Sequence, residues 1–319
     1  MKKILLLIVL LVLAAGCTGN RQVQVDDSNG LRISTFITSP SVVESISGDT
    51  VLFDMEVENV GGTTAKNVQI DLYGVQGQWR DTNGNLLTST QTKTLGTLKP
   101  PIASRNIPGD FKMAQWEFKT PAIPQGITPD LKIEGRVSYD YNTSGHLIVP
   151  VVSEDEFRRS QIESQPIEEP VIINSQGPIK LTLSANNRFI ILDTTSSGST
   201  YTHPFRIELQ NVGAGFPITP EVGGGIIGAG GRLTGTIQLL GPGVEFDDCL
   251  GVSGGNEINL DDASIMVRLR DSGTVPIVCN IKFDKTVWGN RPTDSVQFIF
   301  NLFYRYYVRE EVSVRVVGR

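Results

Sequence analysis

Apolar and polar residues alternate with a period of two along most of this chain. In the first half, the alternating runs start at Leu31, Val51, Val68, Ile133 and Leu147. One side of each run is apolar and the other is polar, which is typical of antiparallel strands with one buried face. Turn-forming pairs such as Asn83-Gly84 separate the runs. The pattern therefore predicts a β-sandwich or barrel.

The same alternation starts again after residue 178. Its runs begin at Ile179, Phe205, Ile237, Ile265, Ile277, Val296 and Val312. The chain has 319 residues, a length that accommodates two domains. The sequence thus predicts an all-β protein with two antiparallel β-sandwich domains in tandem, at residues 29–152 and 179–319.

Two internal matches indicate a duplication. The phrase MEVENVGG at residues 55–62 is echoed by IELQNVGA at residues 207–214, and Asn-Val-Gly closes an alternating run in both. The apolar positions of residues 137–152 also match those of residues 302–317 without a gap. This spacing favours a repeated unit. We therefore expect two related sandwiches that end in equivalent hairpins, the first of which turns between Tyr141 and Leu147.

Residues 153–178 differ in character from both sandwiches. Their first four residues, Ser-Glu-Asp-Glu, fit a capping box, which predicts a short helix over residues 154–161 that ends before Pro166. The rest is acidic and punctuated by proline, as in a semi-rigid linker. We expect a structural spacer here, with a recognition helix as the alternative.

The N-terminus carries a secretion signal. Residues 2–17 read KKILLLIVLLVLAAGC, in which a positive start precedes an apolar run and then small residues. The run is shorter than the roughly 20 apolar residues of a membrane-spanning helix. The sequence LAAGC at residues 13–17 resembles the lipobox of prokaryotic lipoproteins, in which the cysteine is lipidated and becomes the first residue of the mature chain. The alternative is an ordinary cleaved signal with an incidental cysteine.

This resemblance implies that the protein lies on the outer side of the cell and that the membrane is its partner. A lipidated Cys17 would hold the chain on the outer side of the cell membrane, since two acyl chains give stable anchoring. Residues 18–28 lack apolar periodicity and are expected to form a flexible tether. The net charge is −6, with no basic block, which argues against nucleic acid as a partner and against attraction to anionic lipid heads.

The two remaining cysteines form a candidate disulfide. Once Cys17 is assigned to lipid, Cys249 and Cys279 are an even pair in an oxidising compartment. A bridge between them would contribute roughly 3.5 kcal/mol to stability by the chain-entropy estimate. The alternative is two buried free thiols, because Cys279 falls on the apolar phase of its run and free cysteine is also a core residue.

A family resemblance extends the fold prediction. Residues 48–74 (GDTVLFDMEVENVGGTTAKNVQIDLYG), LGTLKPP at residues 95–101 and Trp116-Glu117-Phe118 together resemble the CARDB-type immunoglobulin-like domains of prokaryotic surface proteins. The resemblance covers most of residues 29–150 and implies an immunoglobulin-like sandwich that serves as an adhesion-like or spacer module. The second domain matches only at Asn211-Val212-Gly213 and its last hairpin, and it departs from the pattern with a glycine-rich segment.

Motifs of catalysis lack their usual context. Residues 251–255 fit the G-x-S-x-G string of serine hydrolases, but His146 and His203, the only histidines, both precede Ser253. Residues 223–228 fit G-x-G-x-x-G without the strand and helix of a dinucleotide site. We therefore expect no enzyme and no cofactor.

Metal ligands are also sparse. Residues 81–85 place oxygen ligands at alternating positions, as the start of a calcium loop does. The glycine of such a loop is misplaced, however, and no glutamate closes the loop at its twelfth position, Thr92, so a hairpin turn is expected. No cluster of histidine and cysteine exists in the sequence. We expect no dedicated metal site, while adventitious calcium binding at paired aspartates stays open.

Two regions are candidate contact surfaces. The glycine-rich loop carries Phe216, Ile226 and Ile227 without clear periodicity, so its tip is expected to touch a partner or to pack back on the sandwich. Phe303 and Tyr307 fall on the opposite phase from their apolar neighbours. Exposed aromatic residues near arginine can mark an interface, although packing against a neighbouring domain is the alternative.

Asn142 begins the only N-x-[ST] sequon and falls where the first terminal hairpin is expected to turn. We expect it to be exposed, and glycosylated where the host has the machinery. Together these features predict a non-enzymatic, lipid-anchored surface protein that displays interaction modules to a protein or glycan of the cell envelope. A solute- or glycan-binding lipoprotein is the alternative, and an enzyme on a β-sandwich scaffold is less favoured.

Overall fold

The computed structural model describes residues 23–45, 49–184, 188–193, 197–219, 230–270 and 273–319. The described chain is mostly β-structure, as the alternation predicts. The strands are β1 (Leu31–Ser39), β2 (Val42–Glu44), β3 (Thr50–Asn59), β4 (Ala65–Tyr73), β5 (Gln91–Leu98), β6 (Phe111–Lys119), β7 (Asp130–Ser153), β8 (Val171–Asn174), β9 (Ile179–Leu183), β10 (Ile190–Leu192), β11 (Thr200–Asn211), β12 (Phe216–Ile218), β13 (Gly231–Leu240), β14 (Val244–Cys249), β15 (Glu257–Asn259), β16 (Val267–Leu269), β17 (Thr274–Asp284) and β18 (Thr293–Val317). The helices are η1 (Ala103–Arg105), α2 (Glu154–Glu163) and α3 (Lys285–Trp288).

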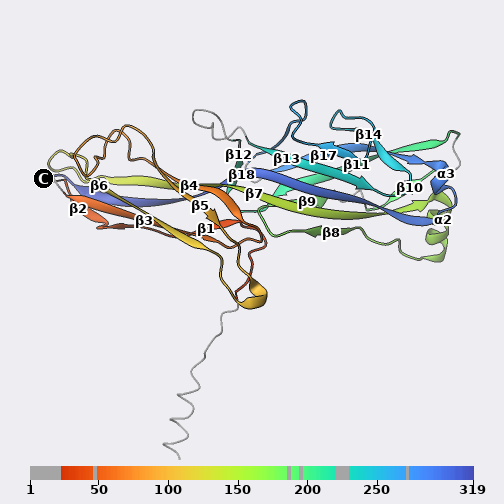
Figure 1. Cartoon of the computed structure of the whole chain (residues 1–319), viewed down its shortest axis with the longest axis horizontal. Coiled ribbons are helices and arrows are strands. Elements are labelled where there is room, and N and C mark those ends of the chain that lie inside the picture. The colour runs from red at the N-terminus through yellow and green to blue at the C-terminus, as the bar shows by residue number, and fades with distance from the viewer. Residues whose placement is uncertain (1–22, 46–48, 185–187, 194–196, 220–229, 271–272) are drawn as a thin grey trace, which may run out of the picture.

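Two long strands organise the molecule. β7 has 24 residues and β18 has 25, and they pair in antiparallel fashion from Val152 with Thr293 to Asp130 with Arg315. At about 3.3 Å per residue such a ribbon extends roughly 80 Å. Figure 1 shows it running lengthwise through both halves of the molecule, which we call the first half (β1 to β6) and the second half (β9 to β17). The middle of the ribbon, where the halves meet, is called the waist.

Each half is a β-sandwich built on one end of this ribbon. In the first half, the sheet β1-β3-β6 covers the ribbon and β4. In the second half, the sheet β9-β11-β17-β14 covers the ribbon and β13, and Phe205 of β11 stacks on Phe298 of β18 with ring centroids 5.1 Å apart. Gly135 of β7 faces Met55 and Phe36, where a Cβ would collide with the methionine. The prediction of an all-β fold with two sandwiches is confirmed.

The predicted terminal hairpins are wrong. Asn142 and Thr143 continue β7 and pair with Phe303 and Leu302, so no turn separates Tyr141 from Leu147. The strand continues because Thr143 occupies a core position, where its Oγ1 lies 2.6 Å from the hydroxyl oxygen of Tyr304. A polar residue at a core position interrupts a hydrophobic pattern without interrupting the strand when a hydrogen-bond partner is present.

The domain boundaries are corrected in the same way. The second part of β7 lies in the second half, and the last part of β18 lies in the first half, so residues 29–152 and 179–319 are not separate bodies. At the ends of the ribbon, β2 pairs in parallel with β18 through Val43 and Val316, and β10 pairs in parallel with β7 through Ile190 and Val151. Each half therefore gives the end of its last strand to the other half.

This exchange follows the internal repeat. The sequence match of residue 137 with residue 302 also matches Asp140 with Arg305, and these two residues are partners across the ribbon. The same match relates Val151 to Val316, the two residues that hold β10 and β2. The structure thus has a pseudo-twofold arrangement centred on the pair of Asp140 and Arg305, as expected of a duplicated unit.

The connection between the repeats is only partly a linker. Ser153 caps α2, since its Oγ accepts a hydrogen bond from the amide of Glu156 at 3.2 Å, and the predicted short helix is confirmed. Residues 171–174 do not belong to a linker, because they form β8 and pair with Gly145 to Ile148 of β7. The extended β7 provides the free edge that this strand needs.

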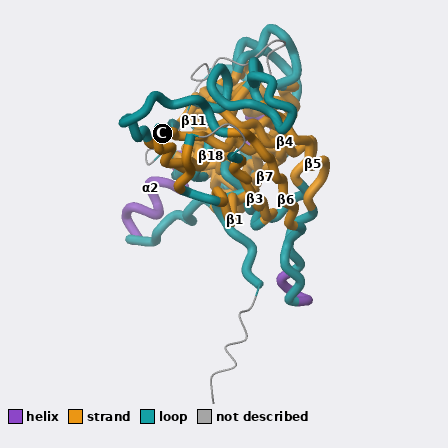
Figure 2. The backbone as a smooth tube through the Cα atoms, turned by 90° about the vertical axis from the view of Figure 1, so that its left-hand side faces the viewer, coloured by secondary structure: helices purple, strands orange, loops and turns teal. Residues whose placement is uncertain are grey.

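Only residues 23–28 of the predicted tether belong to the described chain, and they are not a free tether. The described chain starts at Val23, whose amide donates to Asn106 Oδ1 at 2.7 Å, and the amide of Asp26 donates to the carbonyl of Val60 at 2.7 Å. Lys180 pairs with Asp27 at 3.3 Å. Residues 23–28 are therefore packed at the waist, where Figures 1 and 2 show the start of the described chain close to η1. Within the described residues, no helix has the length and apolar character needed to cross a bilayer.

Candidate functional site

A groove lies on the outer face of the ribbon at the waist. Its volume is about 470 Å³. It is lined by Thr64, Lys66, Asp140, Tyr141, Asn142, Thr219, Arg232, Thr234, Phe303, Tyr304 and Arg305. Side chains alternate between the faces of a strand, so Phe303 and Arg305 face the groove while Tyr304 and Tyr306 face the core. We call this the waist groove.

The floor of the groove is an ion pair at the pseudo-twofold centre. Arg305 donates to Asp140 Oδ1 at 2.8 Å and to the hydroxyl of Ser138 at 2.8 Å. The other carboxylate oxygen of Asp140 accepts from the side-chain amide of Asn67 at 2.6 Å. Charge-assisted bonds of this kind fix both side chains in place, so the floor has a defined shape before any partner arrives.

Arg232 forms one wall. Its guanidinium donates to the carbonyls of Asp262 at 2.8 Å, Asp261 at 3.2 Å and Leu260 at 3.3 Å. These bonds hold the segment after β15 against Arg232. Hydrogen bonds from Ser264, helped by the charge of Arg232, keep the pKa of Asp262 below its usual range.

The described lining carries an excess of positive charge. Lys66, Arg232 and Arg305 are cationic, whereas Asp140 is its one carboxylate. The whole chain has a net charge of −6, so the groove differs in sign from the rest of the molecule. A concave, positively charged site of this kind attracts acidic groups.

Phe303 provides the apolar part of the groove. Its side chain is 53% exposed, and it lies opposite Thr234 of β13 and Asn142 of β7. The predicted contact residue is therefore placed where it can touch a partner. An exposed aromatic ring beside cationic and amide groups is a typical composition for an interaction site.

Tyr307 does not reach the surface. It is 3% exposed, because its ring packs 5.2 Å from the ring of Phe216 and 4.7 Å from the guanidinium of Arg136. Arg136 in turn lies 4.5 Å from the ring of Tyr73. The packing alternative holds for Tyr307, and its predicted contact role is wrong. This stack of rings and cations stiffens the sheet next to the groove.

The glycine-rich loop is described only at its ends. Phe216 is half-buried on β12, with the guanidinium of Arg309 5.5 Å from its ring. Ile226 and Ile227 lie outside the described residues. Phe216 therefore contributes to the packing of the ring stack.

On the opposite face of the ribbon, four tyrosines fill the core at the waist. Tyr139, Tyr141, Tyr304 and Tyr306 form a ring of neighbours with centroids 5.7 to 6.3 Å apart. Burial raises the pKa of all four phenols above their usual range. These hydroxyls stay neutral and act as hydrogen-bonding groups.

The hydroxyls bind the two Asn-Val-Gly turns in the same manner. The amide of Thr63 donates to Tyr141 at 3.1 Å, and the amide of Gly215 donates to Tyr306 at 3.1 Å. In each turn the asparagine closes the loop, since Asn59 donates to the carbonyl of Thr63 and Asn211 to that of Gly215, both at 2.9 Å. The repeated motif is visible in the sequence, but its tyrosine partners are not.

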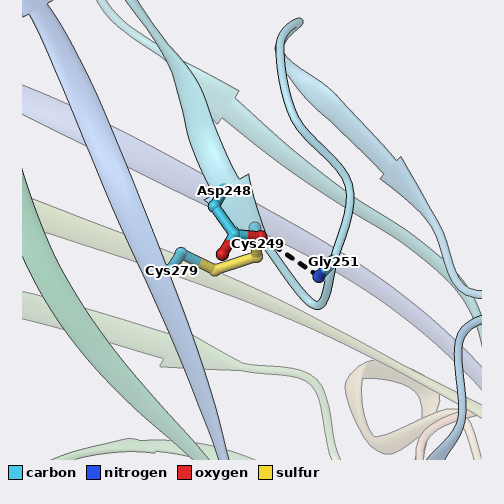
Figure 3. The surroundings of a disulfide bond; sticks show 4 residues. All are labelled: Asp248, Cys249, Gly251 and Cys279. Atoms are coloured by element: carbon cyan, nitrogen blue, oxygen red, sulfur yellow. Dashed lines mark hydrogen bonds between the residues drawn. A yellow bond between two sulfur atoms is a disulfide. The ribbon is translucent and has the colours of Figure 1, made fainter.

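Cys249 and Cys279 form a disulfide, as predicted. They lie opposite each other on β14 and β17 and are buried. Figure 3 shows the bridge next to a turn in which Asp248 accepts a hydrogen bond from the amide of Gly251 at 3.2 Å. The amides of Cys249 and Val252 also bond to each other's carbonyls. The G-x-S-x-G string thus begins in a tight turn after a strand, and the described chain continues to β15 without a helix.

The sequon at Asn142 is not in an exposed turn. Asn142 is half-buried in the middle of β7, and Thr143 is buried. The predicted exposed turn at Asn142, on which the glycosylation prediction was based, is therefore wrong. A glycan on Asn142 would have to occupy the waist groove.

The described residues contain no group of three or more histidine, cysteine, aspartate or glutamate side chains that could hold a metal ion. Residues 81–85 form the predicted turn, in which Asp81 accepts from the backbone amide of Asn85 at 2.8 Å. Gly84 has a φ of 89°, which glycine adopts without strain.

Comparisons with known proteins do not assign this chain to a family. No family model matches the chain, and no curated protein matches it. Among solved structures, it is similar to the Enterococcus faecalis MSCRAMM ACE, with 8% identity, a TM-score of 0.19 and coverage of 92% of this chain and 97% of that one. The CupB6 tip adhesin from Pseudomonas aeruginosa gives 11% identity and a TM-score of 0.16, with coverage of 92% and 97%.

A third likeness, to the Pseudomonas fluorescens DNA glycosylase AlkC, has 12% identity and a TM-score of 0.21 and covers 34% of this chain and 27% of that one. TM-scores this low do not establish a common fold. The function of this chain is therefore argued from its own residues.

Proposed function

We propose that this protein is a non-enzymatic, lipid-anchored surface protein that binds an acidic segment of an envelope protein in its waist groove. The observation that carries the proposal is the groove itself, in which exposed Phe303 lies among Lys66, Arg232 and Arg305. The lipobox-like sequence that ends at Cys17 supports attachment to the membrane. The resemblance of residues 48–74 to CARDB-type domains supports an envelope module.

The rigidity of the strands around the groove favours binding. Its floor lies on a ribbon shared by both halves, and the pair of Asp140 and Arg305 is already formed. A site that is rigid before binding loses less conformational entropy when the partner arrives. The charge excess adds attraction for carboxylates, and it weakens as salt screens it.

The direction of the groove agrees with a surface role. The N-terminal segment contacts the tyrosine side of the ribbon, where the amide of Leu31 donates to Tyr139 at 3.1 Å. Phe303 and Arg305 lie on the opposite face. A chain held by Cys17 would therefore present the groove away from its anchor.

An acidic glycan is the second candidate partner. The groove places the hydroxyls of Thr64 and Thr234 and the amide of Asn142 around the ring of Phe303. Saccharides use such hydrogen-bonding groups together with an aromatic face, and a uronic acid would also find the cations.

The test is photo-crosslinking on intact cells. A benzoylphenylalanine at position 303 should crosslink to an acidic envelope protein, whereas the same group at position 111 should not. Phe111 is more exposed than Phe303, at 65% against 53%, but it lies on β6, away from the groove. Lys66→Glu should weaken the crosslink by reversing one charge. Equal crosslinking at both positions, or none at position 303, would contradict the proposal. Loss of the crosslink upon addition of an acidic oligosaccharide, with direct binding of that oligosaccharide by calorimetry, would favour the second candidate.

A further inference from the structure

The loop between β5 and β6 is a rigid projection with two exposed isoleucines. Ile102 and Ile107 are 43% and 45% exposed. Their backbones bond to each other in both directions, at 2.8 and 3.1 Å, around η1. At the base of the loop, the amide of Lys99 donates to Asp110 Oδ2 at 2.9 Å. We call residues 99–110 the η1 loop.

Single exposed isoleucines are common on protein surfaces, so the position of the η1 loop matters more than its composition. The described chain begins against this loop, since the amide of Val23 donates to Asn106 Oδ1 at 2.7 Å. Figures 1 and 2 both show the start of the described chain beside η1. The loop and the start of the chain therefore point to the same side of the molecule.

The distance to the anchor is short. Residues 18–22 separate Cys17 from Val23, and six extended steps of the chain span at most roughly 20 Å. A lipid on Cys17 would start within the headgroup layer, which is several ångströms thick on each side of the bilayer. Because the amide of Val23 is bonded to Asn106, the η1 loop would then lie within roughly 20 Å of the lipid surface and could reach it.

From this geometry we infer that the η1 loop rests on the outer leaflet, with Ile102 and Ile107 at the boundary between headgroups and acyl chains. The inference depends on the lipid at Cys17 that belongs to the proposed function. Apolar side chains gain free energy at this boundary without further charge attraction. The partner of this surface is thus the membrane itself.

The contact would set the orientation of the whole molecule. In Figure 1, the η1 loop and the start of the described chain lie at the middle of the long axis, on the same side of the body. With the η1 loop on the membrane, the long axis lies along the bilayer and the waist groove faces outward.

Nitroxide depth measurements on the full lipidated chain in membrane vesicles test this contact. One spin label replaces exposed Ser104 in the η1 loop, and a control label replaces exposed Asn83. Asn83 belongs to the segment between β4 and β5, which lies on the opposite side of the body from the η1 loop in Figure 1. The label at position 104 should show a several-fold higher ratio of oxygen to polar-relaxant accessibility than the label at position 83. The double variant Ile102→Ser and Ile107→Ser, which changes only exposed side chains, should abolish that difference.

The outcomes separate the two proposals. If the chain stays with the vesicles but both labels report water, the lipid anchor stands and the η1 contact is wrong. An unchanged ratio at position 104 in the double variant would also overturn the contact, because the isoleucines would then play no part. A chain that does not associate with the vesicles at all would overturn both the contact and the lipid anchor.

Discussion

Asn59 and Asn211 illustrate how much a single residue decides in this fold. Both asparagines accept a hydrogen bond from the glycine two residues later, at 3.1 and 3.2 Å, and both are buried. The sequence shows the Asn-Val-Gly motif twice, which was enough to predict the end of a strand and a duplication. It could not show that Tyr141 and Tyr306 complete each turn, because those contacts join residues about 80 and 90 positions apart.

The substitution Asn211→Ala should destabilise the protein by about 2–3 kcal/mol, since it removes the side-chain donor to the carbonyl of Gly215 and the acceptor of the Tyr306 hydroxyl in a buried site. Urea unfolding would measure the loss. Exposed Asn83 provides the control, and Asn83→Ala should change stability by less than about 0.5 kcal/mol. Equal small effects at both positions would show that the asparagine network contributes little.

The buried tyrosines predict a response to alkaline pH. Burial raises the pKa of Tyr139 and Tyr304 well above the usual value, so the folded state keeps protons that the unfolded state releases near pH 10. Stability is therefore full below about pH 10 and falls as the pH rises further. Absorbance at 295 nm should show delayed phenolate formation in the native protein and a normal midpoint in guanidinium. A native midpoint near 10 for all seven tyrosines would contradict the buried cluster.

At the scale of elements, the alternating pattern predicted the two parts of β7 but not that they form one continuous strand. Period-two alternation predicted strands on both sides of Asn142, and both exist. Asn142, Ser144 and Gly145 are turn-forming residues, so a hairpin was the local expectation. The outcome was decided by pairing with β18, about 160 positions away, and by the hydroxyl of Tyr304, which lies within hydrogen-bonding distance of Thr143. Local chemistry cannot report such distant partners.

Hydrogen exchange distinguishes the continuous strand from a hairpin. Amides of residues 142–145 should exchange as slowly as those of the flanking parts of β7, because the ladder to β18 is unbroken. The turn at Gly84 is the control and should exchange rapidly. Rapid exchange at residues 142–145 would mean that the ribbon is interrupted at the waist.

At the scale of the whole molecule, the repeat was predictable but its arrangement was not. The duplicated sandwiches were predicted from the matched sequence phrases. The disulfide was predicted because two cysteines remain once Cys17 is assigned to lipid, and because an exported protein is in an oxidising compartment. The exchange of strand ends depends on a choice between pairing within a repeat and pairing across repeats, and both choices satisfy the same alternation. The waist groove could not be predicted from the sequence for this reason, although Phe303, one of its residues, was predicted as a contact residue.

The membrane address is tested by Cys17→Ala, which should release the chain from the membrane fraction, because the acidic chain has no basic block to hold it there. Fractionation with a carbonate wash measures this. Thr18→Ala keeps the cysteine and should stay in the pellet. Persistence of Cys17→Ala in the washed pellet would refute the lipid anchor.

The central structural claim is that both halves form one body around the shared ribbon, since the waist groove exists only there. A protease site placed in the exposed segment of residues 164–170, between α2 and β8, tests this claim directly. After cutting, the two fragments should stay together through the pairing of β7 with β18 and should unfold in a single transition. Fragments that separate under native conditions, each with its own melting transition, would show two independent sandwiches and would contradict the account.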